Sequence, residues 1–321
     1  MNQAQSKEIG SVLLKSRSVL LTTHINPDGD GIGSGLALMN ELLRRGKNVE
    51  FINRDTAPKM YSFLPNSDKI KTAKKITKCY DAMVVLECPD LSRNGNILDY
   101  DRQCGKILNI DHHMGNGMYG HINVVEPKAA AVGVQIFQLM KELKWKISPV
   151  VAACLYTAIV TDTGSFRYSN TTPQVHRIAA ELLELGANPD QICSEVYATS
   201  KKSTRLFTEM LKVMKLEDKF GYSYLTRAMF KKTGAEESET DNFINTIRSI
   251  KGIEISILFK ETLSGTVKAS FRSKNGTDVN LLAKKFGGGG HMHAAGCAID
   301  KPIKTAIAMV IKEVRKYLKG K

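Results

Sequence analysis

The sequence of 321 residues lacks long hydrophobic runs and paired cysteines. No apolar run is long enough to span a bilayer, and the N-terminus, MNQAQSKEIG, lacks the basic and apolar regions of a signal peptide. The six cysteines are scattered without a C-x-x-C pair, which argues against a zinc knuckle or a disulfide framework. We therefore expect a cytoplasmic protein with small buried thiols and no membrane partner.

Acidic residues are scarce in the second part of the sequence. Residues 1–200 contain 22 lysines and arginines against 20 acidic residues, whereas residues 201–321 contain 24 against 12. This basic half suits an anionic partner such as a nucleic acid, a nucleotide or a polyphosphate. A lysine-rich solvated surface explains the same excess and is the simpler interpretation of charge alone.

Strand and helix patterns alternate through the first part of the chain. The β-rich runs SVLLTTH, NVEFIN, DAMVVLE and GKILNID are interspersed with helical stretches such as SGLALMNELLRRG and VVAACLYTAIV. This alternation predicts an α/β fold in residues 1–190, with a mainly parallel sheet and helices on both faces. A polar helical connector over 191–215 and a smaller α+β domain over 216–321 are expected to follow.

Histidine and acidic residues follow the first predicted strand. The segment HINPDGDGIGSG contains His24, Asp28 and Asp30 at the carboxyl end of a parallel strand, where open α/β sheets place their sites. Hard oxygen ligands with an imidazole suit Mn²⁺, Mg²⁺ or Fe²⁺ better than structural zinc. An Asx-rich turn that caps the next helix is the alternative for this segment taken alone.

Three further element ends deliver carboxylate or imidazole groups. These groups belong to Glu87 and Asp90 in VVLECPD, to Asp111, His112 and His113 in NIDHHMG, and to Asp162 in AIVTDTGSF. A buried charge needs a partner or a metal, and together the segments supply about the ligand set of a two-metal hydrolytic site. If the strand persists through the two histidines, they point to opposite faces and have different roles.

These segments resemble the four motifs of the DHH phosphoesterase superfamily: HINPDGD, VVLECPD, DHH and TDTGSF. GGGGHMHAAG at 287–296 resembles the glycine-rich substrate motif of the DHH-associated C-terminal domain, and VKASFRS at 267–273 resembles the strand before it. Size and layout are most similar to the oligoribonuclease/pAp-phosphatase (NrnA-type) group. That group degrades short RNA oligonucleotides and dephosphorylates 3′-phosphoadenosine 5′-phosphate (pAp).

The resemblance implies a site for two divalent cations, with Mn²⁺ first and Mg²⁺, Co²⁺ or Fe²⁺ as alternatives. One cation would be held by His24, Asp28 and Glu87, and the other by Asp30, Glu87, His112 and Asp162. The resemblance also implies two catalytic groups: His113 would face the phosphate, and Asp111 would orient an imidazole.

Glu87 departs from the superfamily pattern, which has aspartate at this position. Three interpretations remain open. Glu87 bridges the two metals after a small backbone adjustment, Asp90 takes its place, or one metal site is weakened and the protein is a nucleotide sensor without enzymatic activity.

The resemblance further implies substrate contacts, mostly in the C-terminal domain. The expected contacts are Arg93, Ser270, Arg272, Ser273, Gly287, Gly288, Gly289, Gly290 and His291. The implied reaction hydrolyses short single-stranded oligoribonucleotides to mononucleotides, and pAp to AMP, by a metal-activated water. Hydrolysis of linear or cyclic dinucleotides, pyrophosphate or polyphosphate is the alternative; cleavage polarity (3′–5′ or 5′–3′) and a monomeric or homodimeric state stay open.

Overall fold

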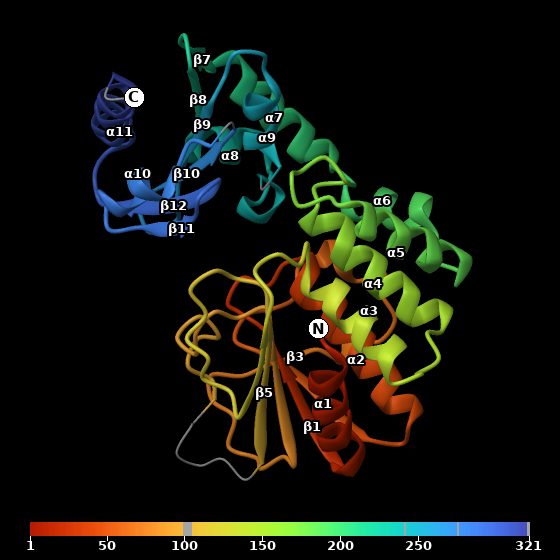
Figure 1. The fold of residues 1–321 in the computed structure, drawn as a ribbon. Coiled ribbons are helices and arrows are strands. Elements are labelled where there is room, and N and C mark those ends of the chain that lie inside the picture. The colour runs from red at the N-terminus through yellow and green to blue at the C-terminus, as the bar shows by residue number, and fades with distance from the viewer. Residues whose placement is uncertain (99–104, 241, 275, 320–321) are drawn as a thin grey trace. The chain divides into compact units, whose positions relative to one another are not determined.

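The computed structural model describes residues 1–98, 105–240, 242–274 and 276–319. The chain forms two compact units, Met1–Ala198 and Thr199–Lys321 (Figure 1). Each unit has its own six-stranded sheet and its own hydrophobic core. The predicted fold class, a parallel α/β domain followed by a smaller α+β domain, is confirmed.

The sheet of the first unit is parallel throughout and has the order β3-β2-β1-β4-β5-β6. Its strands are β1 (Ser18–Thr22), β2 (Asn48–Asn53), β3 (Lys71–Thr72), β4 (Ala82–Leu86), β5 (Lys106–Asp111) and β6 (Ile122–Val125). In this register Leu21 pairs with Val84, and Val84 pairs with Leu108. Because β1, β4 and β5 are adjacent and parallel, the segments that follow them emerge at one edge of the sheet.

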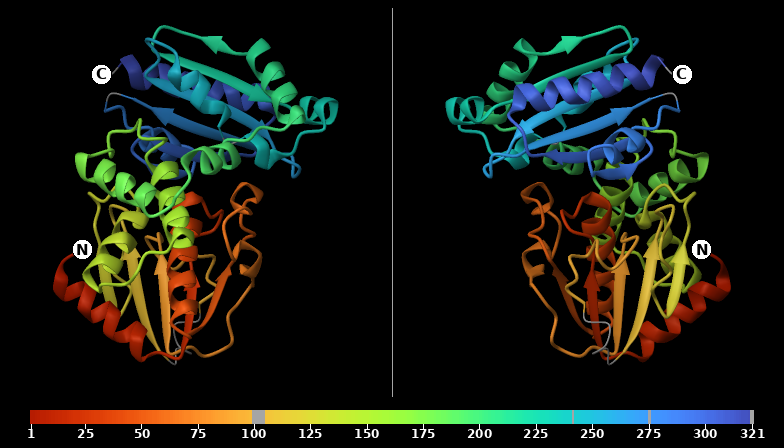
Figure 2. Two further views of the ribbon diagram at one scale, coloured as in Figure 1. Left: turned by 90° about the vertical axis from the view of Figure 1, so that its right-hand side faces the viewer. Right: turned by 90° about the vertical axis from the view of Figure 1, so that its left-hand side faces the viewer.

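The helices of the first unit cover one face of its sheet (Figures 1 and 2). They are α1 (Gln3–Lys15), α2 (Gly29–Arg44), α3 (Val132–Glu142), α4 (Pro149–Asp162), α5 (Pro173–Glu184) and α6 (Pro189–Val196). The sequence predicts helices on both faces, but in the structure connecting segments cover the second face. There the side chains of Leu20 and Val85 pack against residues of these segments, such as Ile97. This detail differs because the described residues after β4 and β5 form loops rather than crossover helices.

Glycines bring α2 close to α4. A Cβ atom on Gly33 would lie 2.5 Å from the carbonyl oxygen of Cys154, and one on Gly29 would lie 2.3 Å from Thr161 Oγ1. Neither distance is compatible with a side chain, so the helix pair requires glycine at both positions. This close approach carries the C-terminal end of α4, with Asp162, toward the start of α2, with Asp28 and Asp30.

The second unit is built on a mixed sheet with the order β11-β12-β10-β9-β8-β7. Its strands are β7 (Lys215–Leu216), β8 (Phe220–Leu225), β9 (Ile255–Glu261), β10 (Val267–Ser273), β11 (Gly289–His291) and β12 (Ala294–Ile299). Its helices are α7 (Lys201–Lys212), α8 (Arg227–Thr233), α9 (Phe243–Ser249), α10 (Asn280–Lys284) and α11 (Ile303–Lys319). One face packs on α10 and α11, and Leu225 and Leu258 on the other face pack on α7, α8 and α9.

The segment 191–215, which the sequence suggests as a connector, contains the boundary between the two units. Within it, α6 contributes Ile192 and Val196 to the core of the first unit, and α7 contributes Leu206 and Met210 to a cluster in the second. Across the described ranges, no helix is both long and apolar enough to cross a lipid bilayer.

Three cysteines follow the sequence expectation of buried thiols, two do not, and Cys104 lies outside the described residues. The thiols of Cys88, Cys154, Cys193 and Cys297 are free, and all but Cys193 are buried. Cys79 is exposed and disulfide-bonded, so the expectation of buried thiols is wrong for this residue. It lies in the exposed segment before β4.

Candidate metal centre

The loop after β1 and the start of α2 supply the first group of ligands. His24 Nε2 lies 3.3 Å from Glu87 Oε2 and 3.9 Å from Asp28 Oδ2. The Nδ1 atom of His24 lies 2.7 Å from the Ile25 carbonyl oxygen, so Nδ1 carries the proton and the lone pair of Nε2 is left available for a cation beside the carboxylates. Asp28 caps α2 through Oδ1, which accepts from the amides of Asp30 and Gly31. Capping of α2 by Oδ1 therefore leaves Oδ2 of Asp28 available for a cation.

A second group of ligands converges from α2, α4 and the loop after β5. His112 Nε2 lies 4.0 Å from Asp30 Oδ2 and 3.9 Å from Asp162 Oδ2. Its Nδ1 lies 3.0 Å from the carbonyl oxygen of Ala129, which again leaves Nε2 toward the acids. Three donors hold Asp30 in place: the amides of Val132 and Gly133, at 2.5 and 2.9 Å, and the Ser34 hydroxyl at 2.9 Å.

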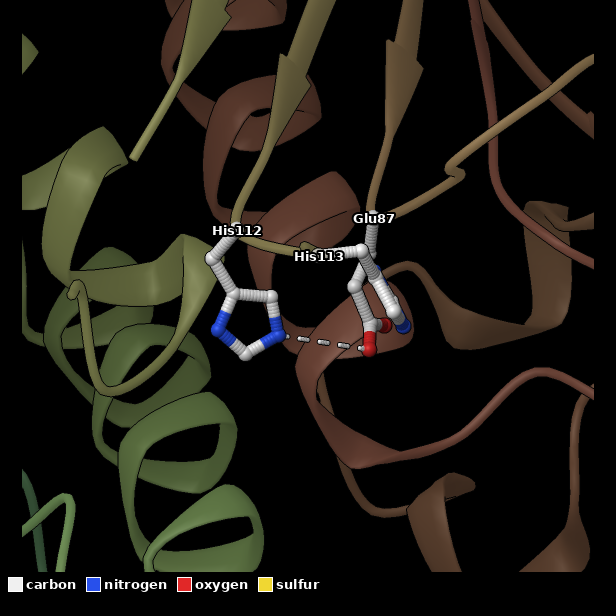
Figure 3. A group of neighbouring side chains, drawn as sticks. All are labelled: Glu87, His112 and His113. Atoms are coloured by element: carbon white, nitrogen blue, oxygen red, sulfur yellow. Dashed lines mark ion pairs between the residues drawn. The ribbon is translucent and has the colours of Figure 1, made fainter. Parts of the chain in front are cut away.

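Glu87 lies between the two groups. Figure 3 shows its carboxylate facing the ring of His112, with His113 beside it. Besides its contact with His24, it places Oε1 3.9 Å from His112 Nε2. Its backbone has φ of 52°, a left-handed conformation that residues with a Cβ atom rarely adopt and that clusters at functional sites. The side chain is 4% exposed, and its Oε2 has no hydrogen-bond partner in the described part of the chain. Burying such an oxygen without a donor is costly, and a bound cation would compensate it.

Three sets of potential ligand atoms each lie within 4.8 Å of one another. They are His24, Asp28 and Glu87; Asp30, His112 and Asp162; and Glu87, His112 and His113. Carboxylate oxygens combined with one or two imidazoles suit divalent cations such as Mn²⁺. The donor set and the unpartnered oxygen of Glu87 thus fit two neighbouring cations.

Crowding of the carboxylates disfavours their ionised forms. Burial, followed by the charges of Asp28 and Asp30, raises the pKa of Glu87 well above its usual value. Burial likewise raises the pKa of Asp162 to about 8, although His112 opposes this shift. Burial opposes the imidazolium form of His112, but Asp162 and Asp30 raise its pKa on balance. Cations would relieve this repulsion between like charges.

His113 is held from behind by a polar network. Its Nδ1 lies 2.7 Å from Asp111 Oδ1, and the Asn116 amide donates to Asp111 Oδ2 at 2.6 Å. Burial opposes ionisation of Asp111, but His113 and Asn116 lower its pKa on balance. Asp111 therefore remains a carboxylate that fixes the ring of His113.

The two adjacent histidines do not follow strand alternation. β5 ends at Asp111, so His112 and His113 lie in the loop beyond it. Their ring centroids are 5.2 Å apart with planes at 78°, and both reach the neighbourhood of Glu87. Their different environments arise from their Nδ1 partners, a backbone carbonyl for His112 and a carboxylate for His113.

Asp90 and Arg93 lie in a turn beside the centre. Asp90 Oδ1 accepts from the amides of Ser92 and Arg93, and Asp90 belongs to none of the ligand sets found among the described residues. The Arg93 side chain is exposed, but its carbonyl oxygen accepts from the Ile25 amide at 2.6 Å. Arg93 thus supports the segment next to His24 through its backbone.

Several supporting groups are not predicted by the sequence. The backbone atoms of Ala129, Val132 and Gly133 hold His112 and Asp30, and a backbone contact leaves no side-chain signal. Asn116 and Gln135, which donate to the side chain and carbonyl of Asp111, are polar residues without a motif of their own. Only Asn116 is close enough in sequence to DHH to have suggested a role.

In the second unit, part of the predicted substrate set shares one face of the sheet. Ser270 and Arg272 alternate with core residues on β10 and pair with the small residues Gly296 and Ala294 of β12. Gly289 of β11 pairs with the same Gly296, and His291, of which the structure describes only the backbone, pairs with Ala294. The pairing register therefore brings these positions onto one face that carries small neighbours.

The glycine run is required by backbone packing. A Cβ atom on Gly288 would lie 2.2 Å from the Gly296 carbonyl oxygen, and one on Gly290 would lie 2.5 Å from that of Ala294. Gly287 has φ of 71°, in the left-handed region that favours glycine. Ser273 lies on the opposite face: it is buried, and its hydroxyl donates to the Thr277 carbonyl and contacts His293 Nδ1.

Comparisons with known proteins agree with this geometry. Residues 18–159 match the DHH family, N-terminal domain, and residues 217–320 match the DHHA1 domain. The chain is 32% identical to the bifunctional oligoribonuclease and PAP phosphatase NrnA of Thermus thermophilus, over 94% of this chain and 90% of that protein. It is 30% identical to the protein of the same name from Bacillus subtilis, over 88% and 89%. The crystal structure of an exopolyphosphatase-related protein from Bacteroides fragilis superposes with a TM-score of 0.92 at 26% identity, covering 98% of this chain and 97% of that one. The chain therefore belongs to the DHH family of phosphoesterases, with a DHHA1 domain in its second unit.

Proposed function

We propose that this protein hydrolyses short oligoribonucleotides to mononucleotides and pAp to AMP. The observation that carries the proposal is Glu87, which lies between two ligand sets and has an unpartnered buried oxygen. The relatives from Thermus thermophilus and Bacillus subtilis, whose names state both activities, support this choice of substrates.

Two divalent cations, with Mn²⁺ the first candidate, would be held by the two sets. His24, Asp28 and Glu87 would form one site, and Asp30, His112 and Asp162, again with Glu87, would form the other. When bound, such a pair supplies a hydroxide at neutral pH and neutralises phosphate charge.

His113 is the proposed catalytic side chain. Asp111 orients its ring through Nδ1, so that a proton on Nε2 would stabilise negative charge on a phosphate oxygen or be donated to the leaving oxygen. Asn116 donates to Asp111 and thereby limits rotation of its carboxylate. Asp111 thus acts as a positioning residue.

Substrate contacts are proposed on the face of the second sheet that carries Ser270 and Arg272. The Arg272 guanidinium would bind a phosphate through two parallel hydrogen bonds. The amides of Gly287–Gly290 would approach a phosphate without obstruction by side chains, with His291 beside them. Arg93 of the first unit is a further proposed substrate contact, because its exposed side chain is accessible to a ligand.

The test is hydrolysis by the full-length protein with Mn²⁺ of RNA dinucleotides, RNA pentanucleotides, pAp, pyrophosphate and polyphosphate. We expect mononucleotides from the RNA and AMP from pAp. Orthophosphate from pyrophosphate or polyphosphate, with no turnover of RNA or pAp, would refute the substrate class. Binding of RNA and pAp without turnover, with activity gained in Glu87→Asp, would instead identify a nucleotide sensor. Loss of activity in Glu87→Gln, but not in the exposed control Glu184→Gln, would tie turnover to the centre.

A further inference from the structure

A groove of about 600 Å³ runs along α11 in the second unit. Its wall consists of residues that recur at helical spacing on one side of α11, and its remaining side is Tyr222 of β8. The lining residues are Tyr222, Lys304, Ile307, Ala308, Ile311, Lys312, Arg315, Lys316 and Lys319. The two views of Figure 2 show α11 along one side of the second sheet. Pairing places Tyr222 on the same face as Ile257 and Phe271, opposite the face with Ser270 and Arg272, so the groove is separate from the proposed substrate face.

The groove is strongly cationic. Lys304, Lys312, Lys316 and Lys319 are exposed, and none of them forms an ion pair within the described ranges. Arg315 is the exception, because it makes two hydrogen bonds with Glu217, at 3.0 and 2.7 Å. No acidic residue lines the groove. The four lysines extend from Lys304 to Lys319 of α11, a rise of ~22 Å, so their positive charge forms a line rather than one point.

The floor between these cations is apolar and contains an ordered aromatic ring. Ile307 and Ile311 pack into the core of the unit from α11. The Tyr222 ring stacks on Phe220, with centroids 6.4 Å apart at 20°, and meets Phe259 edge-on at 6.3 Å. Because its neighbours already restrict this half-buried ring, stacking on its open side would cost little conformational entropy.

A cationic line beside an aromatic surface is the combination by which proteins bind single-stranded nucleic acid, with phosphates on lysines and bases on rings. We propose that the α11 groove binds single-stranded RNA longer than a dinucleotide. The inference shares with the proposed function the assumption that RNA is a ligand, but it does not depend on hydrolysis. A fully inorganic polyanion would bind the lysines but make no stacking contact with Tyr222. An acidic protein would lack bases that could stack on the Tyr222 ring.

The test measures binding of a fluorescent RNA 12-mer to the full-length protein in EDTA by anisotropy. Each phosphate neutralised on a single strand contributes ~0.7 to the slope of log affinity against log salt, so Lys312→Gln with Lys316→Gln should lower the slope by about 1.4. This change corresponds to about 20-fold weaker binding at 0.1 M salt, since counterion release vanishes near 1 M. The matched control, Lys202→Gln with Lys231→Gln, removes two exposed lysines of α7 and α8, on the other face. It should bind like the wild type.

Unchanged affinity of the groove variant, or an equal loss in the control, would overturn the proposal. Tyr222→Leu distinguishes RNA from polyphosphate: we expect about five-fold or greater loss for the 12-mer and none for a polyphosphate of equal charge. Equal losses for both ligands would overturn the assignment to RNA. A change in oligomeric state of the lysine variant on gel filtration without RNA would also overturn the assignment to RNA, because it would mean that a second copy occupies the groove.

The groove variant should hydrolyse RNA dinucleotides like the wild type. Groove-dependent 12-mer binding by a protein that hydrolyses no dinucleotide would refute the proposed function alone.

Discussion

Replacement of Glu87 by glutamine should have opposite effects on the metal-free and the metal-bound protein. Glutamine keeps the shape of the side chain and cannot ionise, so it removes the repulsion between Glu87 and the charges of Asp28 and Asp30. It also offers N–H donors to these acids where Oε2 of Glu87 has no hydrogen-bond partner among the described residues. An unsatisfied buried polar atom costs ~1–3 kcal/mol, and 1 kcal/mol shifts Tm by about 2–4 °C in a unit of this size. In EDTA, Glu87→Gln should therefore unfold about 2–12 °C higher than the wild type.

With Mn²⁺ the order should reverse. A ligand at 100 times its Kd stabilises the native state by about 2.7 kcal/mol per site, so two sites give the wild type about 5 kcal/mol. Glu87 lies between both ligand sets, so its replacement should remove most of this gain. Differential scanning calorimetry in EDTA and in Mn²⁺ measures both effects, with the exposed Glu184→Gln as a neutral control. A variant that is less stable than the wild type in EDTA yet gains the full Mn²⁺ shift would refute this reasoning.

Three further predictions concern pH, catalysis and packing. In EDTA the Tm should rise as pH falls from about 8 toward 5, because Asp162 and Glu87 have raised pKa values in the native state and bind protons that the unfolded chain releases. A Tm that falls over this pH range would contradict the raised pKa values. Saturating Mn²⁺ should remove the pH dependence of the Tm. His113→Ala should abolish turnover while metal analysis still finds about two Mn²⁺ per chain; loss of a metal would assign this side chain to ligation instead. Gly33→Ala should lower the free energy of unfolding by ~1–3 kcal/mol, because the added methyl group overpacks against the α4 backbone, and should therefore lower Tm. Gly117→Ala, where the nearest atom to the added Cβ lies 3.7 Å away, should leave Tm unchanged.

The sequence by itself determines which elements form and which chemistry is available. The apolar runs before His24, Glu87 and Asp111 form adjacent parallel strands, so their carboxyl ends meet at one edge as the pattern predicts. Apolar periodicity is a local property that reports burial directly. The order of carboxylates and imidazoles along the chain likewise indicates a site for divalent cations before any coordinates are known.

Only the tertiary structure decides how these groups are presented. The left-handed backbone of Glu87, the use of Asp90 in a turn, and the burial of Ser273 on the face away from Arg272 have no local signature. The amides that hold Asp30 belong to residues 102 and 103 positions away. The covering of the second face by loops likewise follows from contacts between distant segments. The physical reason is the same in each case: the conformation at a strand end is set by its neighbours in space, whereas sequence patterns report only its neighbours along the chain.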